Sequence, residues 1–410
     1  MLSVLQNRTY CHLLAAQVVA LTGTGLATVA LGLLAYQLAG DAAGLVLGTA
    51  LTIKMVAYVI IAPIAAALAE RADRRRMLVA LDVVRALVAM CLPFVTETWQ
   101  IYALIFVLQS ASAGFTPAFQ ATIPDVLTDE QDYTKALSLS RLAYDMESLL
   151  SPMLAAALLL FVSFDNLFWG TSLGFVASAL LVVSVALPSP QSTKRRGIYQ
   201  RTTRGVRLYL ATPRLRGLLA LSWAAAALSA MVIVNTVVIV RTDLGLSASA
   251  VAIALAGFGG GSMLAALILP RLLGKYKDRR VMLSGAIFGT ASMAMSATAF
   301  ALTSVSLTGL TLLWACVGFG YSATLTPSGR LLTRSARPED RPAVFAAQFT
   351  LSHACWLVLY PLAGWILTQT GTAQTLAWMT LAAVPGLVAA TLIAPGTDHK
   401  TVSKEHPDIS

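Results

Sequence analysis

The stretch Leu13–Leu38 (LLAAQVVALTGTGLATVALGLLAYQL) decides the fold of this chain, because it contains no charged residue. It is longer than the ~20 residues that an α-helix needs to cross the hydrocarbon core of a membrane. Lipid offers the backbone no hydrogen-bond partner, so spanning segments of this length must be helical. Eleven further stretches share this character: Gly44–Leu68, Met77–Val95, Ile101–Gln120, Leu137–Phe161, Leu167–Leu187, Leu215–Val240, Ala248–Leu273, Val281–Leu302, Leu307–Leu325, Ala343–Leu367 and Thr375–Ala394. The sequence therefore predicts an all-α membrane protein with 12 transmembrane helices.

Composition supports this class of protein and disfavours enzymes. Hydrophobic residues make up 57% of the chain and charged residues only 12%, which is typical of membrane proteins. The first apolar stretch is too long for a signal peptide, so we expect a retained helix. The four cysteines lie singly and without metal-ligand spacing, which predicts neither a metal site nor another cofactor. The chain also lacks a Walker motif and a catalytic triad, and we expect no enzymatic activity.

Basic residues gather in every second connection between the apolar stretches. They form the runs Arg71–Arg76, Lys194–Arg216, Arg271–Arg280 and Arg330–Arg341. The odd-numbered connections carry acidic residues, with Arg241 as their only cation: Asp41, Glu97, Asp165 and Asp243. The positive-inside rule then places both termini and the basic connections in the cytoplasm. We attribute the net charge of +10 to this topology and to attraction by anionic lipid headgroups, and not to nucleic-acid binding.

Residues Pro188–Pro213 (PSPQSTKRRGIYQRTTRGVRLYLATP) interrupt the apolar pattern after the sixth stretch. Apolar and basic residues interleave there, which predicts a short helix on the membrane surface. The expected organisation is an N-terminal six-helix bundle (1–188), a basic linker (189–213), a C-terminal six-helix bundle (214–395) and a cytoplasmic tail (396–410).

The two halves repeat each other at an offset of about 205–210 residues. Four segments of the first half have similar counterparts in the second: Asp73–Arg75 and Asp278–Arg280, Thr116–Pro117 and Thr326–Pro327, Asp129–Glu130 and Glu339–Asp340, and Ser151–Pro152 and Tyr360–Pro361. Duplicated halves with a site between them are the architecture of many secondary transporters.

The run from Ala66 to Arg75 (AALAERADRR, which is A-x-L-A-E-R-x-D-R-R) resembles the loop 2–3 signature of the major facilitator superfamily, G-x-L-A-D-R-x-G-R-R. It departs from that signature at Ala66, Glu70 and Asp73. The segments Pro117–Asp125, Ala136–Leu142 and Leu5–Tyr10 resemble the branch of siderophore exporters and nickel-resistance permeases. The resemblance implies the major facilitator fold of two six-helix pseudo-repeats. The chain lacks the His-rich tail common in the nickel permeases, since it ends with only His399 and His406.

Four ionisable residues fall within predicted membrane helices, where charge is costly and usually functional. These candidates for proton coupling or substrate binding are Lys54, Asp145, Glu147 and His353. Asp145 lies one turn from Arg141 and could neutralise it, whereas Glu147 has no such neighbour and is the better proton site. The alternatives are a snorkelling Lys54 and a packing role for His353. The resemblance implies that Lys54 approaches His353, while the carboxylates face the seam between helices five and eight.

Two further sets complete the expected transport machinery. A cytoplasmic gate network of paired charges is expected from Glu70, Arg71, Asp73, Arg74, Arg75, Asp82, Arg85, Asp278, Arg279 and Arg280, which could alternatively be solvated topogenic charge. The resemblance implies that helices one, four, seven and ten line the cavity, with Gln17, Thr22, Thr24, Gln109, Ser112, Asn235 and Ser322. The run Ser148-x-x-Ser151-Pro152-x-x-Ala155-Ala156 resembles the helix-five antiporter motif with small residues in place of glycine.

These observations predict a monomeric, proton-coupled exporter in the bacterial inner membrane, which moves a small organic or chelated substrate by alternating access. Lys54 beside His353 would repel a free divalent cation, which favours organic or chelated cargo. The alternatives are a nickel or cobalt resistance exporter, uptake by proton symport, and a membrane sensor or scaffold that transports nothing.

Overall fold

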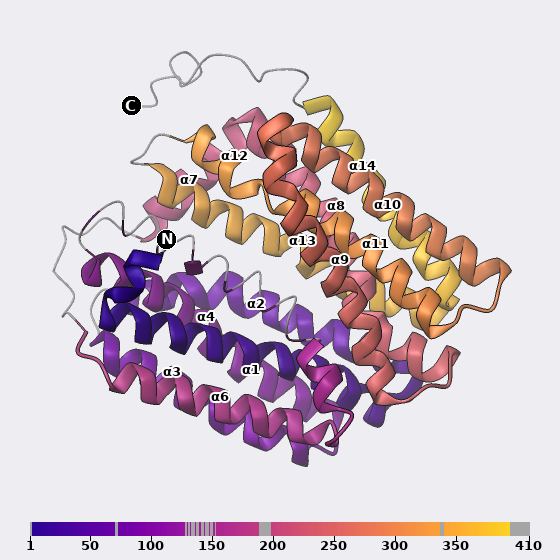
Figure 1. The fold of residues 1–410 in the computed structure, drawn as a ribbon, viewed down its shortest axis with the longest axis horizontal. Coiled ribbons are helices and arrows are strands. Elements are labelled where there is room, and N and C mark those ends of the chain that lie inside the picture. The colour runs from indigo at the N-terminus through magenta and orange to yellow at the C-terminus, as the bar shows by residue number, and fades with distance from the viewer. Residues whose placement is uncertain are drawn as a thin grey trace.

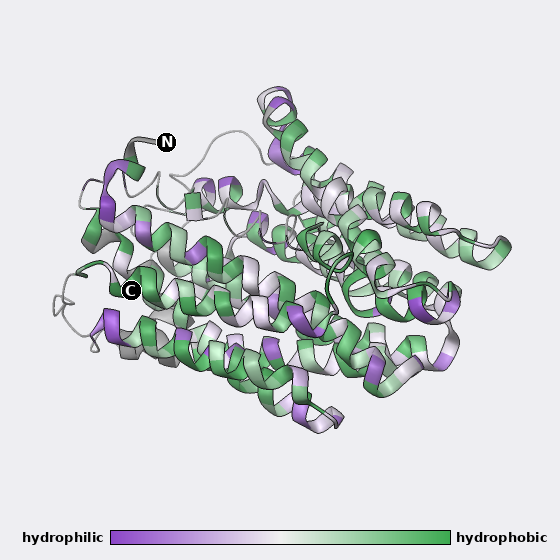
Figure 2. Cartoon of the chain, turned by 60° about the horizontal axis from the view of Figure 1, so that its bottom comes forward, coloured by the Kyte–Doolittle hydropathy of each residue, from purple (hydrophilic) through white to green (hydrophobic). Residues whose placement is uncertain are grey.

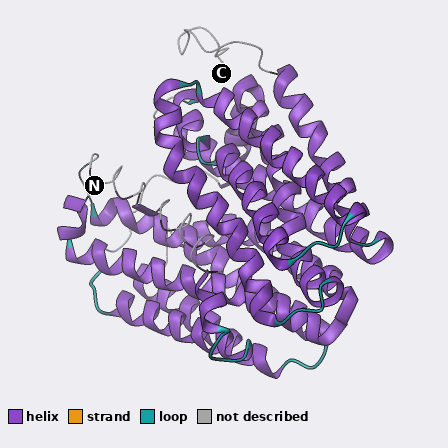
Figure 3. Ribbon diagram, turned by 45° about the vertical axis from the view of Figure 1, so that its right-hand side comes forward, coloured by secondary structure: helices purple, strands orange, loops and turns teal. Residues whose placement is uncertain are grey.

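The computed structural model describes residues 2–69, 73–127, 129, 132, 136, 139–140, 143, 147, 151, 153–187, 198–336 and 340–393. Every regular element among these residues is a helix, as Figures 1 and 3 show. The prediction of an all-α protein is therefore confirmed. Within the described part of the chain, nine segments are long and apolar enough to cross a membrane, and the first of them, Arg8–Ile61, contains two helices.

The helices follow each other in two groups separated by a short helix. The first group contains α1 (Arg8–Ala39), α2 (Ala43–Ala69), α3 (Arg74–Cys91), α4 (Thr98–Val126) and α6 (Asp165–Val183). The described residues between 132 and 158 are mostly helical as well. After the short α7 (Ile198–Ala211), the second group contains α8 (Pro213–Val238), α9 (Ala248–Lys275), α10 (Asp278–Leu302), α11 (Leu307–Leu325), α12 (Ser328–Ser335), α13 (Arg341–Thr370) and α14 (Thr372–Ile393).

Local sequence signals set several of the helix ends. The side chain of Asn7 accepts a hydrogen bond from the Tyr10 N–H (3.0 Å) and caps α1. Ser306 does the same for α11 by accepting from the Gly309 N–H (3.2 Å). These bonds satisfy backbone donors that have no partner inside the helix. Gly40 and Gly371 end α1 and α13 with φ of 53° and 81°, a conformation that glycine adopts without strain.

The outer surfaces of both groups are apolar. Leu173 of α6, Leu267 of α9 and Leu312 of α11 are each more than 60% exposed. Figure 2 shows apolar residues along nearly the whole length of most helices. A water-soluble protein rarely exposes so much contiguous apolar surface, whereas a lipid bilayer covers it.

The charged residues define two ends of the molecule, which we call the basic end and the acidic end. The basic end contains the start of α1, the segment Asp73–Arg76, helix α7 and the segment Lys277–Arg280, and the acidic end contains Asp41, Glu97, Asp165 and Asp243. Figure 1 shows the two groups of helices close together at the acidic end and diverging towards the N-terminus and α7.

The apolar core follows this divergence. At the acidic end one cluster of buried residues includes Leu31 and Leu47 from the first group together with Val237 and Leu367 from the second. At the basic end the buried residues form separate clusters. One, around Tyr10, Leu78 and Phe119, belongs to the first group. The other, around Tyr209, Met282 and Val344, belongs to α7 and the second group. Among the described residues, the core is thus continuous at one end of the molecule and divided at the other.

Glycines bring α2 and α13 into direct contact at the acidic end. A Cβ atom on Gly364 would lie 2.2 Å from the carbonyl oxygen of Gly44, and one on Gly48 would lie 2.7 Å from the carbonyl oxygen of Tyr360. Such approaches are possible only where the side chain is a hydrogen atom. Small residues let membrane helices pack with their backbones in contact, which here joins the two groups.

We expect Gly364→Ala to destabilise the purified protein by on the order of 1–3 kcal/mol, because the added methyl group must push α2 and α13 apart. The matched control is Gly260→Ala, since a Cβ on Gly260 meets no atom within 4 Å. Thermal unfolding in detergent should give a lower Tm for Gly364→Ala, and an unchanged or higher Tm for Gly260→Ala. Equal Tm values for the two variants would contradict this account of the contact.

Candidate functional site

Lys54 and His353 lie in one cluster where α2 meets α13. The Lys54 Nζ atom is 5.9 Å from the ring centroid of Tyr58, which lies one turn further along α2. The Tyr58 ring stacks on the His353 imidazole with the centroids 5.6 Å apart, and the Phe349 ring is 4.0 Å from the same imidazole. Lys54 and His353 thus share Tyr58 as a common neighbour. The cluster therefore links one group of helices to the other.

Glu147 joins the cluster from the first group of helices. Its carboxylate lies near enough to Lys54 for each charge to influence the other, without an ion pair between them. A Cβ atom on Gly25 of α1 would lie 3.5 Å from the Glu147 Cγ atom, which places this carboxylate beside α1. Lys54, Glu147 and His353 each keep part of their accessible surface. None of the three side chains is therefore completely enclosed by the described residues.

This placement corrects one expectation from the sequence. Glu147 was expected at the seam between the fifth and eighth predicted helices, apart from Lys54, whereas the structure brings the two charges together. Their formal charges cancel, so the preference for anionic or chelated cargo that Lys54 alone would create does not follow. Asp145 lies outside the described residues.

The imidazole of His353 has a defined orientation. Its Nδ1 atom is 2.6 Å from the carbonyl oxygen of Phe349. A carbonyl oxygen only accepts hydrogen bonds, so Nδ1 carries the proton and Nε2 of the neutral ring is left as an acceptor. Trp356, three residues along α13, donates from Nε1 to the Ser229 hydroxyl of α8 (2.8 Å) and so fixes the aromatic side of the cluster.

The arrangement offers little to a metal ion. Cys355 is buried, and its thiol lies 3.6 Å from the carbonyl oxygen of Leu351. Two residues of separation place Cys355 on a different side of α13 from His353. In the described part of the chain, no three His, Cys, Asp or Glu residues lie close enough together to hold a metal ion.

The seven residues expected to line the cavity divide into two sets. Thr22 and Thr24 of α1 keep partial exposure, and their hydroxyls donate to the carbonyl oxygens of Val18 (2.9 Å) and Ala20 (3.0 Å). The other five are buried and so do not form an open lining: Gln17, Gln109, Ser112, Asn235 and Ser322. The prediction was wrong for these five because helical position alone does not tell a cavity from a helix–helix contact.

Asn235 is the clearest of these corrections. Its side-chain Nδ2 donates to the carbonyl oxygen of Ala363 on α13 (3.0 Å). Its Oδ1 lies close to Gly44 of α2, where an added Cβ would approach it to 2.8 Å. Asn235 therefore holds α8 against α13 at the point where both meet α2.

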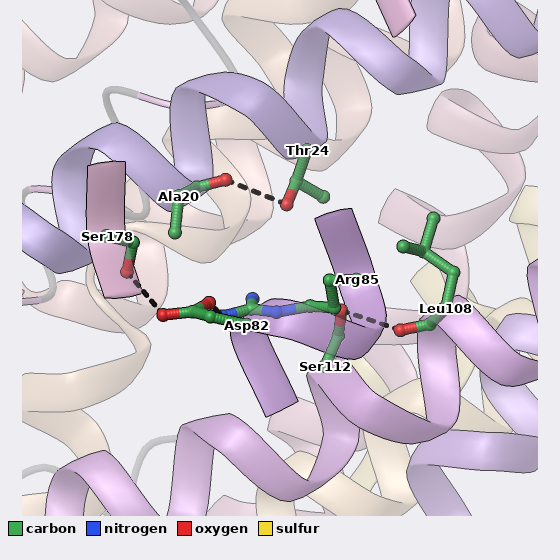
Figure 4. A network of polar contacts seen from close by, with 7 residues as sticks. All are labelled: Ala20, Thr24, Asp82, Arg85, Leu108, Ser112 and Ser178. Atoms are coloured by element: carbon green, nitrogen blue, oxygen red, sulfur yellow. Dashed lines mark hydrogen bonds and ion pairs between the residues drawn. The ribbon is translucent and has the colours of Figure 1, made fainter. Parts of the chain in front are cut away.

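Asp82 and Arg85 of α3 form a buried ion pair inside the first group of helices (Figure 4). The Ser178 hydroxyl of α6 donates to the free oxygen of Asp82 (2.7 Å). The Arg85 guanidinium lies between the rings of Phe115 and Phe175, 4.2 Å and 4.5 Å from their centroids. The pair thus ties α3 to α4 and α6.

At the basic end, arginines bind the exposed carbonyl groups where neighbouring helices finish. Arg75 donates to the carbonyl oxygen of Val183 at the end of α6. Arg279 donates to the carbonyl oxygen of Ala390 near the end of α14 (2.8 Å). Each bond stays within one group of helices. It places a positive charge at the negative end of a helix dipole.

The shared role of Arg75 and Arg279 aligns α3 with α10 one residue differently from the alignment that the sequence repeat predicts. Asp73 is the N-cap of α3 and accepts from the Arg76 N–H (3.1 Å), whereas the N-cap of α10 is Lys277. Asp278 is instead buried in the first turn of α10 and pairs with Arg330 (3.5 Å) and Arg334 (2.9 Å). The structural counterpart of Asp73 is therefore Lys277 and not Asp278.

The remaining members of the expected gate network differ in their surroundings. Arg74 is buried, whereas Arg280 is exposed at the start of α10. Glu70 and Arg71 lie outside the described residues.

Sequence reasoning missed a polar contact that joins the two groups at the acidic end. The Thr242 hydroxyl donates to the Asp41 carboxylate (2.9 Å), and the Arg241 guanidinium lies 5.3 Å from the Tyr36 ring centroid. Arg241 and Thr242 belong to a π-helical turn, Ile239–Asp243, which follows α8. Such turns are rare and are frequent at functional sites. The isolated cation Arg241 among acidic connections was the available signal.

We expect Asp82→Asn to destabilise the purified protein far more than Ser178→Ala does. The first change leaves Arg85 buried without its carboxylate, and breaking a buried ion pair costs about 3–5 kcal/mol. The second removes one hydrogen bond to a charged group, worth about 1.5–3 kcal/mol. Thermal unfolding in detergent measures both. If the two variants unfold at the same temperature, the ion pair does not stabilise the first group of helices.

The comparisons with known proteins agree with this architecture. Two overlapping matches to the family model of the Major Facilitator Superfamily cover residues 13–236 and 218–407. The solved nucleoside transporter NupG shares the fold with a TM-score of 0.71 at 13% identity, over 94% of this chain and 99% of that chain.

Curated relatives match over shorter segments. The MFS-type transporter YfiS of Bacillus subtilis is 27% identical over 124 residues, which is 30% of each chain. Macrolide efflux protein A of Streptococcus pyogenes is 25% identical over 149 residues, which is 35% of this chain and 36% of that protein. These matches span about a third of the relatives' length. The family model, in contrast, matches almost the entire sequence. This chain is a member of the Major Facilitator Superfamily, whose fold its helices adopt.

Proposed function

We propose that the chain is a proton-coupled secondary exporter of small organic compounds. The observation that carries this proposal is the cluster of Lys54, Glu147 and His353 between two groups of helices whose described core is divided at the basic end. Ionisable groups within a membrane-spanning bundle are expensive and are retained for transport. The aromatic rings around His353 suit an organic cargo. The likeness to macrolide efflux protein A favours such cargo over a metal ion.

The proposed orientation places the basic end in the cytoplasm of a bacterial cell. Lys and Arg gather at that end, and the positive-inside rule assigns such loops to the cytoplasmic side of the inner membrane. The conformation described above then faces inward, with the site open to the cytoplasm. We expect the chain to work as a monomer, with both termini cytoplasmic.

Export requires the opposite conformation as well. The contacts between Gly44 and Gly364, and between Asp41 and Thr242, would separate on the outer side. The divided basic end would close, which brings Arg75 and Arg279 towards each other. Movement of one repeat against the other about a central site is the general mode of such transporters.

Coupling to protons would use the carboxylate of Glu147. When Glu147 is ionised, its charge cancels that of Lys54, and the cluster is neutral. When Glu147 takes up a proton, Lys54 keeps a positive charge without a counter-charge from this carboxylate. A change of one unit of charge in a low-dielectric region is large enough to alter both substrate affinity and the balance between conformations.

The orientation is tested with single cysteines in a variant whose four native cysteines are replaced by serine. In intact cells, a membrane-impermeant thiol reagent should label Asp165→Cys and leave Arg280→Cys unlabelled. After the membrane is permeabilised, both should react, because both positions keep accessible surface. Labelling of Arg280→Cys alone in intact cells would reverse the orientation and make the described conformation outward-facing.

Coupling is tested with Glu147→Gln in proteoliposomes loaded with a radiolabelled macrolide. A pH gradient should drive at least tenfold less transport than in the wild type, because the amide cannot release or bind the coupled proton. Exchange of labelled for unlabelled macrolide at equal pH should persist, since exchange requires no net proton movement.

The matched control is Asp165→Asn, which removes a carboxylate from the acidic end and should leave both activities unchanged. Wild-type pH-driven transport by Glu147→Gln would remove Glu147 from the coupling mechanism. Nickel or cobalt resistance that the wild type confers and His353→Ala abolishes would favour the metal exporter instead.

A further inference from the structure

A cavity about 560 Å³ in volume lies among the second group of helices, and its lining does not include Lys54, Glu147 or His353. Helices α7, α8, α13 and α14 form its walls. The lining is aliphatic and aromatic and includes Leu219, Trp223, Leu351, Pro385 and Ala389. The only charged residue in the lining is Arg216. A volume of this size, apolar walls and a single polar group are typical of a binding site for an amphiphilic small molecule.

This cavity is separate from the central cluster because the two lie on different faces of α13. Leu351, Ala354 and Cys355 line the cavity. Phe349 and His353 contact Tyr58 of α2. Residues one turn apart share a face of a helix, whereas His353 and Cys355, two residues apart, point in different directions.

The surroundings of the cavity show that it borders the lipid. Ala354 is itself exposed. Val358 of α13, one turn from Ala354, and Val388 of α14, next to Ala389, are 49% and 48% exposed. Apolar side chains exposed on membrane helices contact acyl chains.

Arg216 marks the end of the cavity nearest the membrane surface. It is the fourth residue of α8, at the basic end, and its side chain is exposed. Its guanidinium forms no hydrogen bond or ion pair with any other residue of the chain that is described. Trp223 lies seven residues further along α8, which is a rise of ~10 Å towards the membrane interior.

We propose that this cavity binds one acyl chain of an anionic phospholipid, with the phosphate group on Arg216. An arginine matches phosphate geometry with two parallel hydrogen bonds. No acidic residue lines the cavity to compete for the guanidinium. Basic pockets between membrane helices are known to bind anionic headgroups. The cavity is open on one side, and its apolar lining there suits an acyl chain. The proposal depends on the membrane-spanning fold and not on the transported substrate or the direction of transport.

The test is native mass spectrometry of the purified full-length chain with phosphatidylglycerol or phosphatidylcholine at equal concentration. The wild type should bind phosphatidylglycerol about five-fold more strongly, because phosphatidylcholine carries the same phosphate but offsets its charge with the choline cation, so only phosphatidylglycerol offers Arg216 a net anionic headgroup. In Arg216→Gln the ratio should fall to about one. In Ala389→Phe, which fills the cavity, binding of both lipids should decrease.

Two control variants keep the result specific. Arg271→Gln removes an exposed arginine from the end of α9, and Val384→Phe adds a ring to the exposed face of α14. Both should retain the five-fold preference and the wild-type amount of lipid. Glycerol phosphate, which has the headgroup charge and no chain, should not compete. An unchanged preference in Arg216→Gln, unchanged binding in Ala389→Phe, or competition by glycerol phosphate would each overturn the proposal.

Discussion

A lysine and a glutamate inside a membrane-spanning bundle are tolerable only if each supplies the counter-charge of the other. Lys54 and Glu147 belong to segments almost 100 residues apart in the sequence, yet they lie near enough for each charge to influence the other. An isolated charge in such surroundings carries a large desolvation penalty. The pair therefore constrains how α1, α2 and the helical residues around Glu147 can pack, and His353 extends the constraint to α13. The residues of the candidate site therefore also form part of the contact between the two groups of helices.

The division of the apolar core indicates how one group of helices can move relative to the other. Apart from the contacts of the Tyr58 ring with Phe349 and His353, the buried contacts between the groups are concentrated, among the described residues, at the acidic end, where glycines allow α2 and α13 to touch. At the basic end, each group has its own buried cluster and its own arginine bound to a helix end. Each group can therefore rotate as a unit, and the contacts that must be broken and remade are mainly those of the shared core at the acidic end.

The sequence predicts the fold well because the lipid environment leaves few choices. The apolar stretches correspond to α1–α4, α6, α8–α11, α13 and α14 within a few residues, and the repeat anticipates two similar groups. Side-chain surroundings are a different matter. Gln17 and Asn235 were assigned to a cavity because their helices border one, but burial depends on which face each residue occupies. Tyr58 and Phe349 carry no signal of their own, since aromatic residues in apolar stretches are common. Their role follows only from stacking on His353.

The one-residue shift of the repeat reveals how the two groups solve the same packing problem differently. With Asp73 aligned to Lys277, Asp82 and Arg85 of α3 correspond to Ala286 and Gly289 of α10. In the first group these positions hold a buried ion pair that contacts α4 and α6. In the second group a Cβ atom on Gly320 of α11 would lie 2.4 Å from the Gly289 Cα atom, so the helices meet through their backbones. A buried ion pair holds neighbouring helices through charge and through the direction of its hydrogen bonds. Glycine contacts hold them through the close approach of the two backbones. In the first group, one substitution in the Asp82–Arg85 pair would leave a buried charge without its partner. In the second group, the Gly289–Gly320 contact would be disturbed by a larger side chain and not by a change of charge.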